Sequence, residues 1–230
     1  MPDTRRTLDY LGLVAPALAL GTLFLATIID PRFNWASRSL SSMGEATPHS
    51  LFALGSADQL AFVLFNGGLL LGSVLGLPFS VRLWQLASNR AERIGVGFLV
   101  VALVAMGGVG IAYLDGPVAG LHFLAAVSFF LFGTFALLAY GTGTVLAGEA
   151  RRGLAILWAG IGHLLVWVFW VVLETMAFTT DGDTWTYFAV PEAVGAVVFG
   201  VFVFVTARRD LRELTASSPA ESESDTEQVA

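Results

Sequence analysis

Six long apolar runs, separated by short charged gaps, constrain this chain more than any other feature of its sequence. Each run is about twenty residues long, the length with which a helix crosses a hydrocarbon core of about 30 Å. The runs lack the alternation of polar and apolar residues that marks membrane β-strands. Charged residues make up only 13% of the chain, about half of what covers a soluble domain. The sequence therefore predicts an all-α, polytopic membrane helical bundle with six transmembrane helices.

The boundaries of the runs divide the chain into a membrane domain and a tail. The membrane domain covers residues 1–209, and its predicted spans are residues 8–29, 59–81, 94–114, 119–146, 154–178 and 191–207. Beyond it, residues 210–230 carry many carboxylates and few apolar side chains. Because low hydropathy with high charge is the composition of disorder, we expect an acidic disordered tail in the cytoplasm.

The gaps alternate between arginine-rich and arginine-poor, and this alternation predicts the orientation. One side of the membrane receives only Arg32 and Arg38. The other side receives Arg5, Arg6, Arg82, Arg90, Arg93, Arg151, Arg152, Arg208, Arg209 and Arg212. Short loops rich in arginine stay in the cytoplasm. We therefore expect a multi-pass protein of the cell (plasma) membrane, with its N- and C-termini cytoplasmic.

Residue types that are absent exclude several kinds of chemistry. The chain has no cysteine, which excludes disulfides, thiol catalysis and cysteine-ligated zinc. Its three histidines form no His-x-x-x-His pair, and no glycine-rich phosphate loop or basic aromatic patch is present. We expect no metal, no cofactor and no nucleic-acid partner. Lysine is absent too, and with the acidic tail this suggests a haloarchaeal-like protein, although genomic base composition could also replace lysine with arginine.

Three glycines of the second span, Gly68, Gly72 and Gly76, recur at every fourth position. Glycines at this spacing line one face of a helix and let another backbone approach closely. Packing within the bundle is the first interpretation. A homodimer or a partner helix that docks on this face is the alternative.

Polar residues at membrane depth mark the candidate site. Asp58, Asp115 and Glu192 lie at helix starts or in a turn, where a cap, a turn or the helix dipole accounts for them. Asn66, His122 and Glu174 lie deeper, in the outer half of the predicted bundle, with Trp170 on the same helix face as Glu174 and with Arg38 in the loop above. Ionisable groups at such depth are costly, which makes them functional candidates. A polar clamp between helices is the alternative.

A catalytic interpretation can be built from the same region. Ser39 or Ser41 would act as the nucleophile, His122 as the base, and Asp115 or Glu174 would orient the imidazole. No Gly-x-Ser-x-Gly motif surrounds these serines. This absence favours a function other than catalysis.

Two short motifs resemble a known family. They are the run from Ser37 to Gly44 and the run Leu64-Phe65-Asn66-Gly67-Gly68, and the Asp-Gly-Pro turn before His122 is similar as well. They resemble the domain of unknown function 998 family of archaeal and bacterial six-span membrane proteins. The resemblance implies topology and no activity.

The sequence leads to one functional hypothesis and two alternatives. We expect a membrane protein that binds a lipid head group or small amphiphile in an outward-facing polar pocket, because a tryptophan-rich apolar face meets convergent polar groups there. The alternatives are an outer-leaflet intramembrane lipid hydrolase and a structural or partner-docking membrane subunit.

Overall fold

The computed structural model of the protein describes residues 2–52, 54–118, 120–178 and 186–217. Its long helices are α1 (Pro2–Ile29), α3 (Ala57–Leu86), α4 (Arg90–Ile111), α5 (Gly120–Leu146), α6 (Ala150–Leu173) and α7 (Ala189–Ser217). Six helices are long and apolar enough to cross a membrane. The described residues contain no strand. The predicted all-α, six-helix membrane fold is confirmed.

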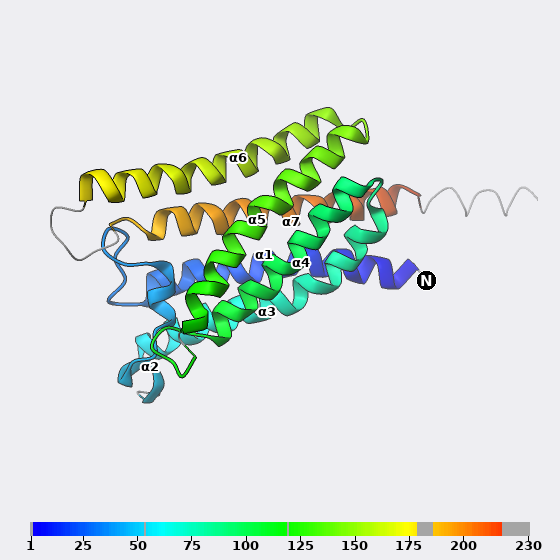
Figure 1. The fold of residues 1–230 in the computed structure, drawn as a ribbon. Coiled ribbons are helices and arrows are strands. Elements are labelled where there is room, and N and C mark those ends of the chain that lie inside the picture. The colour runs from blue at the N-terminus through cyan, green and yellow to red at the C-terminus, as the bar shows by residue number, and fades with distance from the viewer. Residues whose placement is uncertain (1, 53, 119, 179–185, 218–230) are drawn as a thin grey trace, which may run out of the picture.

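Three short elements occur at the opposite end of the bundle from the termini. The connection from α1 to α3 contains the 3₁₀ helix η1 (Leu40–Gly44) and the helix α2 (Pro48–Phe52). A π-helical turn, η2 (Glu174–Phe178), follows α6. Both described ends of the chain lie at the other end of the bundle (Figure 1). We call these two ends the loop end and the terminus end.

The helices continue beyond the predicted spans at the terminus end. The α7 helix runs to Ser217, so the first part of the predicted disordered tail is helical. Asp210 within this extension is buried, at 8% exposed, because it faces the bundle rather than solvent. Residues 218–230 lie outside the described residues.

Local capping explains where α3 and α4 begin. The hydroxyl of Ser56 accepts a hydrogen bond from the amide of Gln59, so Ser56 and not Asp58 is the N-cap of α3. Asp58 instead forms an ion pair with Arg32, at 2.8 Å. At α4, Asn89 accepts from the Glu92 amide and Glu92 accepts from the Ser88 amide, so the carboxylate and the cap satisfy free amides at both sides.

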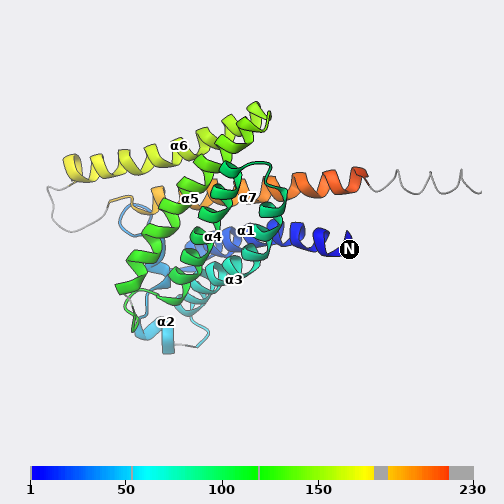
Figure 2. The same cartoon turned by 45° about the vertical axis from the view of Figure 1, so that its right-hand side comes forward.

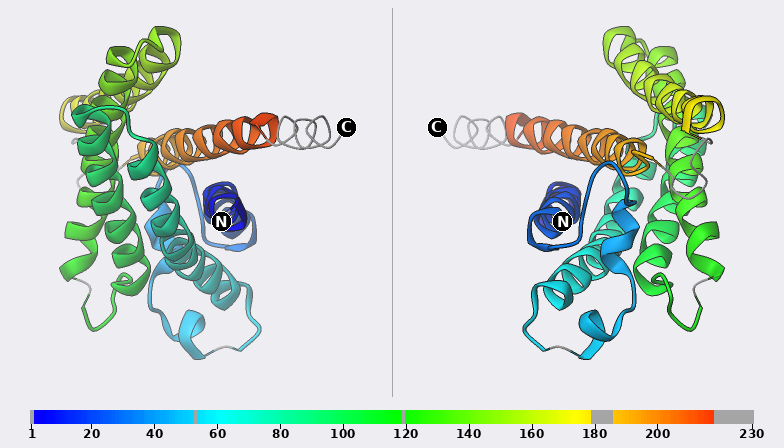
Figure 3. Two further views of the ribbon diagram at one scale, coloured as in Figure 1. Left: turned by 90° about the vertical axis from the view of Figure 1, so that its right-hand side faces the viewer. Right: turned by 90° about the vertical axis from the view of Figure 1, so that its left-hand side faces the viewer.

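The glycine face of α3 is used within the chain. A Cβ atom on Gly68 would collide with Thr22, and one on Gly72 would lie 2.7 Å from Ala19. The α1 helix therefore occupies this face, and Figure 3 shows α1 between α3 and α7. Close backbone approach of this kind supplies dispersion contacts in a bilayer, where the hydrophobic effect does not drive helices together. Gly68 and Gly72 therefore pack within the bundle, as the first interpretation expects.

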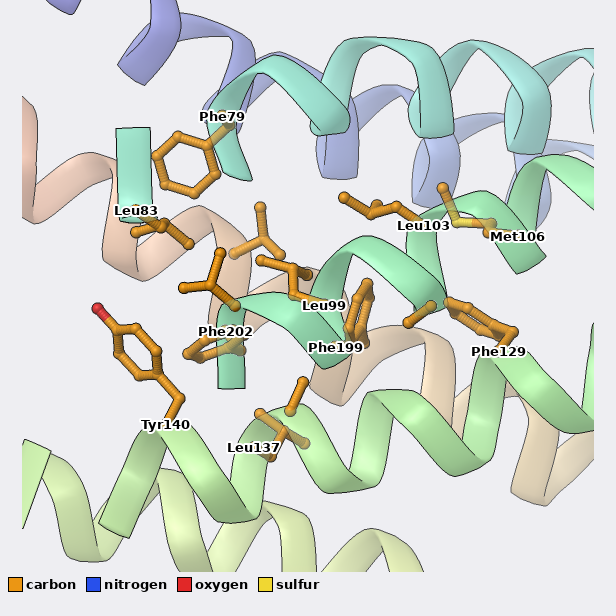
Figure 4. Packing of buried hydrophobic residues seen from close by; sticks show 14 of the residues in the cluster. Phe79, Leu83, Leu99, Leu103, Met106, Phe129, Leu137, Tyr140, Phe199 and Phe202 are labelled. Carbon is orange, nitrogen blue, oxygen red and sulfur yellow. The ribbon is translucent and has the colours of Figure 1, made fainter. Parts of the chain in front are cut away.

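The core forms where α3, α4, α5 and α7 converge. Its large side chains include Phe79, Leu99, Phe129, Leu137 and Phe202, which interdigitate from these four helices (Figure 4). The α6 helix lies at the edge of the bundle, against α5 and α7 (Figures 1 and 2). Its loop end diverges from the loop end of α5 in both views. This divergence separates residues of α5 and α6 for which the sequence predicts the same depth in the membrane.

Candidate binding site

The η1 segment is folded into the loop end of the bundle. All five of its residues, Leu40 to Gly44, are buried. Two side chains from the helices hold its backbone. The carboxylate of Glu192 at the start of α7 accepts from the Leu40 amide at 2.6 Å, and the Asn66 amide group on α3 donates to the Gly44 carbonyl at 3.2 Å. A short 3₁₀ helix has weak internal hydrogen bonds, so these anchors determine its position.

The loop serines and Arg38 complete the frame of η1. Ser42 donates to the Ser39 carbonyl at 2.6 Å, and the hydroxyls of Ser39 and Ser41 are 3.0 Å apart. Arg38 donates to the Ser42 carbonyl and forms an ion pair with Glu45 at 3.0 Å. Arg38 therefore braces the segment from its solvent side.

A carboxyl pair links the end of η1 to the turn between α4 and α5. The Ala46 amide donates to the Leu114 carbonyl at 2.8 Å, and the side chain of Glu45 forms a hydrogen bond with Asp115. Burial and this bond raise the pKa of Glu45 above its ordinary value of 4.5, against the attraction of Arg38. Two carboxyl groups can share a hydrogen bond only when one carries a proton.

His122 lies in the first turn of α5 and is 4% exposed. Its Nδ1 is 2.8 Å from the Ala112 carbonyl oxygen, at the end of α4. Because a carbonyl only accepts, Nδ1 carries the hydrogen and Nε2 carries a lone pair. Nε2 is buried and has no hydrogen-bond partner among the described residues. Neither Asp115 nor Glu174 orients this ring, since the Ala112 carbonyl takes that place.

A small cavity lies beneath η1, and we call it the loop-end cavity. It measures about 50 Å³, and its three polar lining residues are Ser41, His122 and Glu192. The rest of its wall is apolar. Ser41 and His122, which the sequence predicted as site residues, therefore line the same cavity. Glu192 lines it with them, although its place at a helix start first suggested a role at the helix dipole.

A second cavity lies next to the first, and we call it the central cavity. It also measures about 50 Å³ and runs between α1, α3, α4, α5 and α7, with Gly72 and Gly76 in its wall. The two cavities share the lining residues Leu23, Leu69, Met106, Phe129 and Ala196. The two cavities are therefore neighbours: the loop-end cavity has polar groups near η1, and the central cavity is lined by apolar side chains in the middle of the bundle.

Glu174 and Trp170 belong to a different part of the loop end. Glu174 accepts from the amide of Thr186 at 3.1 Å, and the Trp170 indole donates to the carbonyl of the same residue at 2.9 Å. They tie α6 to the start of α7 at the edge of the bundle. The structure therefore separates these two predicted site residues from His122 and Asn66, because α6 diverges from α5.

Glu192 is the residue that sequence reasoning missed. It follows Pro191 in the first turn of α7, where a carboxylate usually faces solvent and the helix dipole. In the structure it is 6% exposed and bonds the η1 backbone. In the sequence Glu192 is a carboxylate next to a predicted span. Its partner, the Leu40 amide, lies 152 positions away, so the sequence pattern does not point to the contact.

The geometry defines the class: a multi-pass membrane helical bundle that encloses a polar-ended cavity under an anchored loop. Among the residues that the structure describes, no group of three His, Cys, Asp or Glu side chains could hold a metal ion. The chain belongs to the DUF998 family, described as "Protein of unknown function (DUF998)", whose model matches residues 13–209. No curated protein and no solved structure matched the chain.

Proposed function

We propose that the protein binds a small amphiphile at the two neighbouring cavities, with the polar group of the ligand at His122 and its apolar part toward the middle of the bundle. The single observation that carries this proposal is the buried, unpartnered Nε2 of His122 at the polar end of an otherwise apolar space. A buried acceptor without a partner costs about 1–3 kcal/mol. A ligand hydroxyl or ammonium that donates to Nε2 removes that cost.

The distribution of arginines supports a position of this cavity near the outer leaflet. The ten arginines predicted to be cytoplasmic lie in helix segments at the terminus end, whereas Arg32 and Arg38 lie at the loop end. By the positive-inside rule, the terminus end faces the cytoplasm of a cell whose plasma membrane holds the protein. The lysine-free composition and acidic tail support a haloarchaeal-like source.

Entry of the ligand requires η1 to move. Each cavity, at about 50 Å³, is far smaller than the 300 Å³ or more of a typical ligand pocket. The η1 segment covers the polar end and is held by a few side-chain bonds, from Asn66, Glu192 and Arg38. It acts as a cover that opens toward the outer leaflet.

Native mass spectrometry of the protein extracted in detergent from its membranes tests this proposal. The wild type retains a bound amphiphile. His122→Asn keeps a donor for the Ala112 carbonyl and removes Nε2, and it should lower the retained fraction by about tenfold, since one buried bond is worth about 1.4 kcal/mol. Retention equal to that of the wild type would overturn the assigned role of Nε2.

A second variant tests the apolar end. Ala196 lines both cavities, so Ala196→Phe should fill them and abolish retention. Ala155→Phe on the exposed face of α6 is the matched control and should retain the ligand. Loss in both variants would point to a general defect rather than to the cavities.

One observation favours an intramembrane lipid hydrolase as the second candidate function. Ser41 and His122 line the same cavity, and Nε2 of His122 carries the lone pair that a general base needs. Ser41 would give its proton to Nε2 and attack the carbonyl of an outer-leaflet ester, the alcohol would leave with that proton, and water would then release the fatty acid from Ser41. Release of fatty acid from a lipid ester by the wild type, and its loss in Ser41→Ala with retained ligand, would support hydrolysis. No release by the wild type would exclude it for that ester.

A further inference from the structure

The terminus end contains a second buried polar region, to which the proposed function assigns no role. Next to this region the backbones are closely packed at Gly12 of α1, where a Cβ atom would lie 2.6 Å from Phe79 and 2.7 Å from Ala207. At this level α1, α3 and α7 are in close contact. One helical turn nearer the termini, the same faces carry Asp9, Arg82 and Asp210, each three residues from its contact residue. The three side chains therefore occupy one layer.

This layer is dry and only partly satisfied. Asp9 is 0% exposed, and its Oδ1 forms an ion pair with Nε of Arg82 at 3.3 Å. Its Oδ2 is buried without a hydrogen-bond partner among the described residues, as is Oδ2 of Asp210. Arg152 of α6 also leaves Nη2 unpartnered. Asp210 interacts electrostatically with Asp9, Arg152 and Arg82, which brings the three open atoms into one neighbourhood.

The charges around the layer do not balance. Every helix that spans the bundle contributes polar groups to this end, and several are already paired. Glu92 accepts from Thr144 at 3.2 Å, and Glu149 is bound by Arg209 and Arg152. Glu149 and Arg209 are partly exposed and form a pair at the rim. Within the layer the buried carboxylates are Asp9, Glu92 and Asp210, and the guanidiniums are the buried Arg82 and the partly exposed Arg152. Three negative charges thus face two positive ones, and one negative charge is left over.

We propose that Asp9 and Asp210 bind one monovalent cation, either an alkali ion or a proton, between α1 and α7 at the cytoplasmic end of the bundle. Buried charges need a partner, because the cost of removing them from water is several kcal/mol per ion. The two open carboxylate oxygens provide hard oxygen ligands or share a proton. A water molecule held with the cation accepts from Nη2 of Arg152, which satisfies the third open atom.

The bound cation joins α7 to α1 and thereby affects the stability of the whole bundle. Asp210 lies on α7 and Asp9 on α1, so an unneutralised pair of carboxylates would push these helices apart. The charged and titratable groups that face Asp210 are Asp9, Arg82, Arg152 and Glu213, with Tyr140 and Glu92 reached through Arg152 and Thr144. No titratable group from the loop end takes part in this set.

Thermal unfolding of the full chain in detergent tests the site. Sodium or potassium chloride replaces N-methylglucamine chloride at constant ionic strength, and the pH is varied separately. An alkali ion at saturating concentration should raise Tm by about 5 °C. Asp210→Asn, which preserves the shape of the side chain, should remove the shift. Glu213→Gln is the matched control, because it removes an exposed carboxylate from the same helix and should keep the shift.

The outcomes separate the two sources of positive charge. A Tm that rises with alkali ion and loses the rise in Asp210→Asn identifies an alkali site. A Tm insensitive to alkali ions that rises as the pH falls, with the rise lost in Asp210→Asn, identifies a proton. If neither ion changes Tm, or if Asp210→Asn shifts as the wild type does, the site is disproved.

A second variant keeps the test decisive if Asp210→Asn folds poorly. Arg152→Gln removes a positive charge from the same neighbourhood and leaves Glu149 paired with Arg209. The excess negative charge increases, so the cation-dependent rise in Tm should become larger than in the wild type. A smaller rise would contradict the charge balance on which the site depends.

Discussion

The two buried histidines that the structure describes, His122 and His163, are each 4% exposed, yet they differ in how many of their ring nitrogens have a hydrogen-bond partner. His163 lies about midway along α6. Its Nδ1 is 2.8 Å from the Thr134 hydroxyl, and its Nε2 accepts from the Trp167 indole at 2.9 Å. The Thr134 hydroxyl in turn donates to the Phe130 carbonyl, so Nδ1 of His163 donates to the hydroxyl oxygen and both ring nitrogens have a partner. His122 has a partner for one nitrogen only.

This difference shows that burial of a histidine does not by itself identify a binding residue. The ring of His163 is fixed as a neutral tautomer by a donor on one side and an acceptor on the other, and it joins α5 to α6. The ring of His122 is fixed by the Ala112 carbonyl and leaves a lone pair at a cavity. Satisfaction of hydrogen bonds, rather than depth, separates the structural residue from the candidate ligand.

Removal of the His163 ring should have the largest effect on stability. In His163→Ala the Trp167 indole loses its acceptor and a cavity opens, which together should cost about 2–4 kcal/mol. His122→Ala also removes a buried ring and one hydrogen bond, but it removes the unpartnered Nε2 as well, so it should cost less, about 1–2 kcal/mol. Thermal unfolding in detergent measures both. Equal losses in the two variants would remove the distinction between a structural and a ligand-binding histidine.

A glycine on α7 gives an independent test of the same junction. A Cβ atom on Gly195 would lie 2.5 Å from Nε2 of His163 and 2.8 Å from the Phe130 ring. Gly195→Ala should therefore destabilise the bundle by about 1–3 kcal/mol through overpacking. Gly162→Ala is the matched control, because nothing lies within 4 Å of its added Cβ atom. That change should be neutral or stabilising by up to about 1 kcal/mol, since alanine favours the helix. A neutral Gly195→Ala would show that the His163 junction is loose.

The comparison also explains what could be predicted from the sequence. The apolar runs were sufficient to predict six helices, because length and hydropathy alone determine which segments cross a membrane. They also placed His122, Asn66 and Ser41 at one end of the bundle. Depth is a one-dimensional coordinate, however, and the direction in which each helix leans is set by packing. Glu174 and Trp170 matched His122 in depth, and the tilt of α6 carries them to another edge.

Glu192 shows a second reason why the sequence predicted only part of the site. A carboxylate in the first turn of a helix has an ordinary explanation in the helix dipole. Its contact with the Leu40 amide depends on the folding of a loop that carries no periodic pattern. Similarly, Asp210 was assigned to the predicted acidic tail and Asp9 was not singled out within the first span, and only the packing of α1 against α7 reveals the burial of both.

The smallest predicted effect concerns the cover above His122 and its response to pH. Burial and the bond with Asp115 raise the pKa of Glu45 above 4.5, so the closed cover binds a proton more tightly than an open one. The stabilisation is fully present below the ordinary pKa and is lost as the pH rises through the raised pKa. Acidification from neutral pH toward 4.5 should therefore close the cover and increase its protection from exchange.

Hydrogen exchange at the Ala46 amide, which donates to Leu114, measures this closure after correction for the intrinsic exchange rate. The Tyr187 amide donates to Ala36 in the same region and serves as the internal control. In Glu45→Gln the carboxyl pair no longer needs a shared proton, so the protection of Ala46 should become independent of pH. If Ala46 in the wild type shows the same pH profile as Tyr187, the carboxyl pair does not control the cover. The η1 segment would then be held over the polar end of the cavity by the bonds from Asn66, Glu192 and Arg38.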